Sequence, residues 1–124
     1  MKTQLRETTL NLLRVATGVL YVPHGCQKLF GEHPPDFATL YGWAGLLELI
    51  GGSMIILGLF TRPVAFVLSG QMAVAYWMAH APRGPWPIQN GGELAVLFCF
   101  VYLFLFANGG GSFSLDGLRG RGKA

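Results

Sequence analysis

Ionisable residues inside apolar segments constrain this chain more than any other feature. The chain has Arg14 and His24 in its first apolar segment, Glu48 in the second, His80 in the third and Glu93 at the start of the fourth. Placing a charged side chain at the centre of a membrane helix costs roughly 2.5–3.5 kcal/mol. Such residues usually face a bundle interior, where they pair with one another or bind a ligand. Their spread over four segments predicts a polar site inside an apolar bundle.

The composition indicates an integral membrane protein. Hydrophobic residues make up 52% of the 124-residue chain and charged residues only 12%, whereas a soluble domain carries about 25% charged residues. The length suits one domain, residues 1–124. The net charge of +3 is small, and the basic residues flank the apolar segments. This pattern favours orientation in a membrane over nucleic-acid binding.

Four apolar segments each approach the ~20 residues that a bilayer-spanning helix needs. They cover residues 9–30, 38–60, 63–81 and 91–107. Pro34 and Pro35 interrupt the chain after the first segment, and Pro63 is expected to begin the third. The short connection at residues 61–63 makes the second and third helices antiparallel neighbours. We therefore expect an all-α fold, a transmembrane antiparallel four-helix bundle.

The basic residues also predict the orientation of the bundle. With four spans, the two termini and the second connection share one side, which carries Lys2, Arg6, Arg62, Arg119, Arg121 and Lys123. The opposite side carries Lys28 and Arg83. The positive-inside rule then places both termini in the cytoplasm.

The predicted topology gathers most of the ionisable residues in the outer half of the bundle. Glu48 lies about ten residues into its segment, which is ~15 Å deep at 1.5 Å per residue. His24, His80 and Glu93 lie at the outward ends of theirs, with Lys28 at the rim. Arg14 lies near the cytoplasmic end and is interpreted as a structural anchor.

Glu48 shares a helix face with Gly45 and Gly52, and small residues let membrane helices approach closely. Two interpretations of this carboxyl group stay open. It is either an acid that handles protons or anchors a ligand, or the partner of Arg14, His24 or Lys28 in a structural pair.

His24 and His80 have three interpretations. They hydrogen-bond a ligand carbonyl, they satisfy neighbouring groups, or they ligate haem as a pair. A metal site that adds Glu93 has no recognisable ligand spacing, so we predict no metal. Cys26 and Cys99 have no CxxC spacing and are expected to pack as small apolar residues.

Several aromatic residues lie toward the outward end of the predicted bundle. Trp43, Tyr76 and Trp77 are candidates to stack on a flat ligand, although such residues more often face lipid or the core. Phenylalanines also surround the fourth segment on several faces and are expected to face lipid; they are Phe98, Phe100, Phe104 and Phe106.

A series of motifs runs along the chain: Arg14 with Gly18, the stretches at residues 24–31, 48–52 and 58–62, His80, and the stretches at 90–94 and 110–116. In their order and spacing, these motifs resemble the DoxX family of small bacterial membrane proteins. Gly92 departs from it, because an aromatic residue is expected before the glutamate. The resemblance implies a multi-pass protein of the bacterial inner membrane. It also implies a link to redox systems, since relatives are connected with a thiosulfate:quinone oxidoreductase and with redox-stress complexes.

The leading hypothesis is a membrane component of a redox system, a quinone-binding oxidoreductase subunit. Quinone reduction needs hydrogen-bond donors, a proton relay and apolar walls. The predicted catalytic residues are His24, Glu48, His80 and Glu93, and the predicted quinone-binding residues are His24, Lys28, Trp43, Tyr76 and Trp77.

The sequence contains no convincing haem, flavin or iron–sulfur motif. The hypothesis therefore requires a protein partner, a soluble oxidoreductase or another redox subunit, to deliver electrons. Membrane lipid is expected to surround the bundle. A homo-oligomer is a further expectation. Two alternatives stay open: a small proton-coupled transporter that uses Glu48, and a non-catalytic assembly subunit.

Overall fold

The computed structural model describes residues 2–31 and 39–120, and it is helical throughout its regular elements. The predicted break at Pro34 and Pro35 lies outside the described residues. The helices are α1 (Lys2–Phe30), α2 (Leu40–Leu57), α3 (Thr61–Ala75), the π-helical turn η1 (Tyr76–His80), the 3-10 turn η2 (Ala81–Arg83), α4 (Pro87–Asn90), α5 (Glu93–Asn108) and α6 (Leu115–Gly120). The expected all-α fold with four main helices is confirmed.

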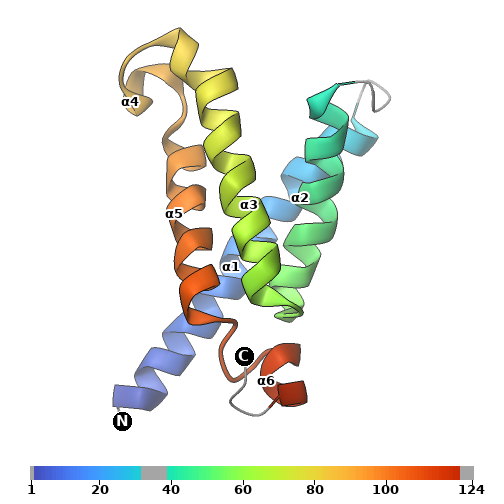
Figure 1. Cartoon of the computed structure of the whole chain (residues 1–124), viewed down its shortest axis with the longest axis vertical. Helices are drawn as coiled ribbons and strands as arrows, with labels where there is room; N and C mark the ends of the chain where they lie inside the picture. Colours follow the sequence, from blue (N-terminus) through green and yellow to red (C-terminus); the bar gives the residue numbers. More distant parts are fainter. Residues whose placement is uncertain (1, 32–38, 121–124) are drawn as a thin grey trace.

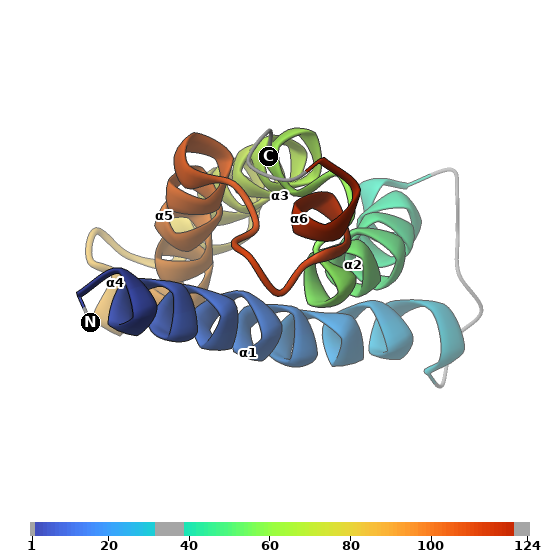
Figure 2. The ribbon, with the colours of Figure 1, turned by 90° about the horizontal axis from the view of Figure 1, so that it is seen from below.

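The main helices form two pairs. α1 packs along α2, and α3 packs along α5. α2 and α3 lie close together near the turn that joins them and separate toward their other ends (Figure 1). Seen from below, the long α1 crosses beneath the other helices (Figure 2). The start of α1 and the short α6 lie at the same end of the bundle, which we call the closed end.

The helix boundaries differ from the predicted segments. α1 begins at Lys2 rather than residue 9, and α3 begins at Thr61, so that Pro63 lies inside its first turn. Within the described residues, the helical stretch Thr61–Arg83 is long and apolar enough to cross a membrane, whereas Gly42–Leu57 and Glu93–Asn108 are apolar but shorter. The four-span topology therefore stays a prediction for the other helices.

Glycines allow α1 and α2 to approach each other closely. A Cβ atom added at Gly25 would lie 2.5 Å from the backbone nitrogen of Leu49 and 2.7 Å from the carbonyl oxygen of Gly45. A Cβ at Gly18 would similarly lie 2.9 Å from the carbonyl oxygen of Gly52. Because backbone atoms cannot move aside cheaply, larger residues at these positions would separate the pair.

The closed end is held together by the segment that follows α5. Asp116 of α6 accepts hydrogen bonds of 2.8 Å from the backbone N–H groups of both Phe60 and Thr61, which begin α3. These N–H groups have no partner within their own helix, so the carboxylate caps α3. Just before them, Gly58 ends α2 with φ of 70°, a conformation that glycine adopts at little cost.

Arg14 joins α1 to the end of α2 and to the segment that follows α5. Its side chain is 2% exposed. It donates to the carbonyl oxygens of Ile55 and Ile56 at the end of α2 and to those of Gly110 and Phe113 beyond α5, and also to the side chain of Asn11. One guanidinium group thus satisfies terminal carbonyls from two separate parts of the chain.

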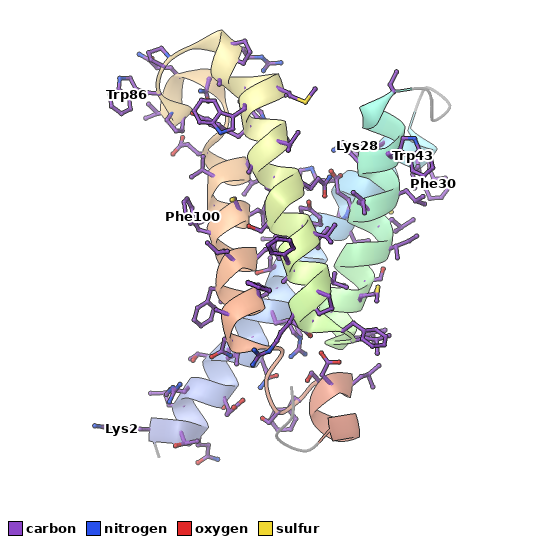
Figure 3. The ribbon with its side chains drawn as sticks, viewed as in Figure 1. Lys2, Lys28, Phe30, Trp43, Trp86 and Phe100 are labelled. Carbon is purple, nitrogen blue, oxygen red and sulfur yellow. The ribbon has the colours of Figure 1, made fainter. Side chains whose placement is uncertain are left out.

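An aromatic cluster connects the two helical pairs. The ring of Tyr21 in α1 meets the rings of Phe98 and Tyr102 in α5 edge-on, with centroids 5.2 and 5.1 Å away. Phe98 is only 5% exposed, so the expectation that it faces lipid was wrong. Phe100 does point away from the bundle (Figure 3). The difference follows from Tyr21, which covers one face of α5 and leaves the opposite face open.

Replacing Arg14 tests the importance of the closed end. We expect Arg14→Met to lower the free energy of unfolding by about 3 kcal/mol or more, because several buried charge-assisted hydrogen bonds are lost. Titration from mild detergent into denaturing detergent measures this energy. Arg62→Met is the matched control, since Arg62 is exposed and makes one long contact of 3.4 Å with the carbonyl of Asn108. Equal stabilities of the two variants would contradict the assignment.

Candidate functional site between the helical pairs

A cavity of about 740 Å³ lies where the two helical pairs separate, and it is lined mainly by apolar side chains from α1, α2, α3, η1 and α5. We call it the interpair cavity. Its polar lining residues are Tyr21, His24, Lys28, Glu48, Gln71 and His80.

Glu48 is a fully buried acidic residue of this cavity. It is 1% exposed, and its Oε2 atom lies 2.5 Å from Nζ of Lys28, whose side chain is 23% exposed. Gly45 and Gly25 make this pairing possible, because they bring α1 and α2 into contact beside it. The ion pair compensates a carboxylate charge that would otherwise stand uncompensated in an apolar environment.

Gln71 of α3 connects this ion pair to the rest of the bundle. Its Nε2 atom donates to Glu48 Oε2 at 2.8 Å and to the carbonyl oxygen of Ala44 at 3.4 Å. Its Oε1 atom accepts from the hydroxyl of Tyr21 at 2.6 Å. The side chains of Lys28, Glu48, Gln71 and Tyr21 therefore form a continuous polar chain, which links one helical pair to the other.

The mouth of the cavity is apolar. Large hydrophobic lining residues of α2, α3 and η1 are exposed there, namely Trp43, Leu47, Val67, Val74 and Met78. Gly70 lies among them, and a Cβ atom added at this position would meet nothing within 4 Å. Lys28 and Trp43 lie near the same end of α2 (Figure 3).

His80 lines the cavity from the π-helical turn that continues α3. Such turns inside α-helices frequently occur at functional sites. Nδ1 of His80 lies 3.2 Å from the carbonyl oxygen of Asn90. Asn90 is itself buried and donates to the hydroxyl of Tyr76 and the carbonyl of Gly84, both at 3.1 Å. The loop before α5 thus holds His80 in place.

The structure brings most of the predicted site residues together. His24, Lys28, Trp43, Glu48 and His80 all line the interpair cavity. His24 is partly buried there and meets Phe98 edge-on, with ring centroids 6.4 Å apart. The roles predicted for these residues stay predictions.

Three of the predicted site residues lie elsewhere. Glu93 is exposed at the start of α5 and is not among the lining residues. Trp77 is 71% exposed, and Tyr76 packs against Asn90 and Gly92 instead. Counting residues along the helices did not determine the side of the helix on which these three residues lie.

Gln71 and Tyr21 belong to the site but were missing from the predicted set. Gln71 was detectable, because a side-chain amide in an apolar membrane segment usually bonds to a neighbouring helix. Tyr21 shares a face of α1 with Arg14, but the partner of its hydroxyl lies on α3, and the sequence alone does not show how α3 is placed.

No group of three His, Cys, Asp or Glu side chains that could hold a metal ion occurs in residues 2–31 and 39–120. Both cysteines are free thiols, and Cys99 accepts a 2.8 Å hydrogen bond at its carbonyl from Ser69.

The described residues form a small α-helical bundle with a cavity and a buried ion pair, and one of its helical stretches is long and apolar enough to cross a membrane. A family model described as DoxX matches residues 9–81, more than half of the chain. The chain therefore belongs to the DoxX family, and the resemblance seen in the sequence is confirmed.

Two relatives from Haemophilus influenzae are similar to this chain, and both carry the description "Uncharacterized protein". One is 39% identical over 118 residues, which cover 86% of this chain and 87% of the relative. The other is 35% identical over 71 residues, which cover 57% of this chain and 47% of the relative. No solved structure matches the chain significantly.

Replacing Gln71 tests the polar chain. We expect Gln71→Met to lower the free energy of unfolding by about 1–3 kcal/mol, because Tyr21 and Glu48 each lose a buried partner. Adding Tyr21→Phe should recover part of this loss, since the orphaned hydroxyl is then removed. The exposed Gln89 provides the control Gln89→Met in the same unfolding titration. Strictly additive effects at positions 21 and 71 would contradict the hydrogen bond.

Proposed function

We propose that this DoxX family protein is the membrane component of a redox system and that it binds a lipid-soluble quinone in the interpair cavity. One observation carries the proposal. A single cavity joins an apolar mouth to a buried polar chain that contains Lys28, Glu48 and Gln71. Such a site suits a ligand with an apolar body and a polar head.

The residues present fit a quinone in size and chemistry. Small-molecule sites usually measure about 300–1,000 Å³ and combine apolar walls with a few polar groups. The exposed apolar residues of the mouth, such as Leu47 and Val74, would hold the tail in contact with lipid. Lys28 and His24 would donate to the ring oxygens, His80 would line the space for the head group, and Trp43 is placed to form a wall.

A bound quinone would supply the capacity to carry electrons and protons together. The chain's own residues would bind the head group, exclude water and hold protons. Glu48 is suited to the last task, because it is buried and connected through Gln71 to the Tyr21 hydroxyl. Electrons would come from a protein partner, for which a soluble oxidoreductase is our proposal.

The ion pair favours this function over proton-coupled transport of a cation. A transporter of that kind would offer its buried carboxylate to the cationic substrate. Here, Lys28 of the same chain already lies 2.5 Å from Glu48. A cationic substrate would therefore have to displace an internal ammonium group.

We further propose that the protein resides in the bacterial inner membrane with both termini in the cytoplasm. The basic residues of the sequence support this orientation, as does the closed end, which contains both the start of α1 and α6. A fluorescent protein fused after residue 124 should fluoresce, and alkaline phosphatase fused after Arg83 should be active in the periplasm. The reverse pair of results would overturn the orientation.

Filling the cavity tests quinone binding. We expect Gly70→Phe to weaken the binding of decylubiquinone at least about tenfold, because the ring enters open space in the mouth without displacing backbone atoms. Equilibrium dialysis of purified protein in detergent measures the affinity. Gly70→Ala is the control and should bind as the unaltered protein does. Absence of saturable binding by the unaltered protein would contradict the proposed function.

A further inference from the structure

We infer that the interpair cavity prefers the reduced, hydroxyl-bearing form of its ligand, a hydroquinone, over the quinone. This inference rests on the proposed function and adds which redox form of the ligand binds more tightly. The observation behind it is an unpartnered atom. Oε1 of Glu48 is buried, and it has no hydrogen-bond partner in the part of the chain that the structure describes.

The other oxygen of the same carboxylate takes the nearby donors. Oε2 accepts from both Lys28 and Gln71. The second N–H of Gln71 is directed to the carbonyl of Ala44, so its amide group is fully engaged. A carboxylate paired with an ammonium group only accepts hydrogen bonds. The unused capacity beside the cavity is therefore that of an acceptor.

His80 adds a second acceptor to the lining. Its Nδ1 atom lies 3.2 Å from the carbonyl oxygen of Asn90. Because a carbonyl oxygen cannot donate, Nδ1 carries the hydrogen in this contact. A neutral imidazole ring then has its acceptor at Nε2.

A hydroquinone and a quinone differ in the groups that they offer to these acceptors. The hydroquinone carries two O–H donors. Oε1 of Glu48 is closed off from the cavity, and one of these donors would satisfy it once the carboxylate turns toward the ligand. The quinone carries only carbonyl acceptors, which would leave that oxygen unpaired and place a second electronegative atom near it. A buried acceptor without a partner is strongly disfavoured, so the reduced form should bind more tightly.

Three probes of nearly equal shape test the preference: decylubiquinol, decylubiquinone and the dimethyl ether of decylubiquinol. Their affinities are measured by anaerobic equilibrium dialysis with purified protein in detergent. We expect decylubiquinol to bind at least about tenfold more tightly than decylubiquinone. The dimethyl ether should bind no better than the quinone, because it has no donor.

Glu48→Gln gives the sharper arm of the test. The amide oxygen of glutamine would remain toward Lys28 and Gln71, so its NH₂ group would take the place of Oε1. This exchanges the spare acceptor for a donor, and the preference should then reverse toward decylubiquinone. Glu7→Gln is the matched control. Glu7 lies outside the cavity lining and accepts from the backbone of Ser112, a bond that glutamine retains.

The outcomes separate the two proposals. If no probe binds, the proposed function fails. If quinol and quinone bind equally well, or if Glu48→Gln folds but keeps the original preference, quinone binding stands and the inference of a reduced ligand is overturned. In that case an ordered water would be the donor to Oε1. Elution volume and helical content of each variant establish that it is folded.

Discussion

The rest of the structure depends on one buried guanidinium group. Arg14 donates to the carbonyls of Ile55 and Ile56 near the end of α2 and to two carbonyls of the segment beyond α5. The Ile55 carbonyl also accepts from the backbone N–H of Gly58, so Arg14 adds a second donor there. Carbonyl groups at helix ends need such donors where no water is present. A planar group with five N–H donors is the side chain best suited to serve several carbonyls at once. Arg14 thereby fixes the relative position of the two helical pairs at the closed end.

The cavity is a consequence of that attachment. Asp116 caps α3 beside Arg14, so the closed end has polar bonds in several directions. Farther along, Gln71 provides the polar link that the structure describes between α3 and the α1–α2 pair. α2 and α3 diverge with distance from the turn that joins them (Figure 1). The interpair cavity lies between them, and the polar chain that contains Gln71 forms part of its lining.

The sequence was sufficient for the fold and for much of the candidate site, because both follow from position along the helices. Apolar length and proline positions predicted the four main helices. Counting residues from their ends placed His24, Glu48 and His80 in the same half of the predicted bundle, and all three line one cavity. Depth does not determine the direction in which a side chain points. Tyr76 and Trp77 belong to a π-helical turn, whose different number of residues per turn changes the facing of its side chains relative to an α-helix.

Partners from distant segments were beyond the reach of the sequence. The sequence offered three candidate partners for the Glu48 carboxylate. Only the packing of α1 against α2 shows that Lys28 is the partner. Phe98 looked like its neighbours in α5 until Tyr21 covered it. The unpartnered Oε1 atom of Glu48 is a property of the packed bundle and has no signature in the order of residues.

The Lys28–Glu48 pair contributes little to stability by itself, and this bears on its purpose. Removing two charges from water costs several kcal/mol per ion, and their attraction often fails to exceed that cost. Apolar residues of similar volume would hold α1 and α2 together as well, since Gly25 and Gly45 already allow close contact. The bundle instead keeps a carboxylate beside a cavity, with one oxygen held firmly and the other without a partner. That asymmetry has no value for packing, whereas it would orient a ligand that donates a hydrogen bond.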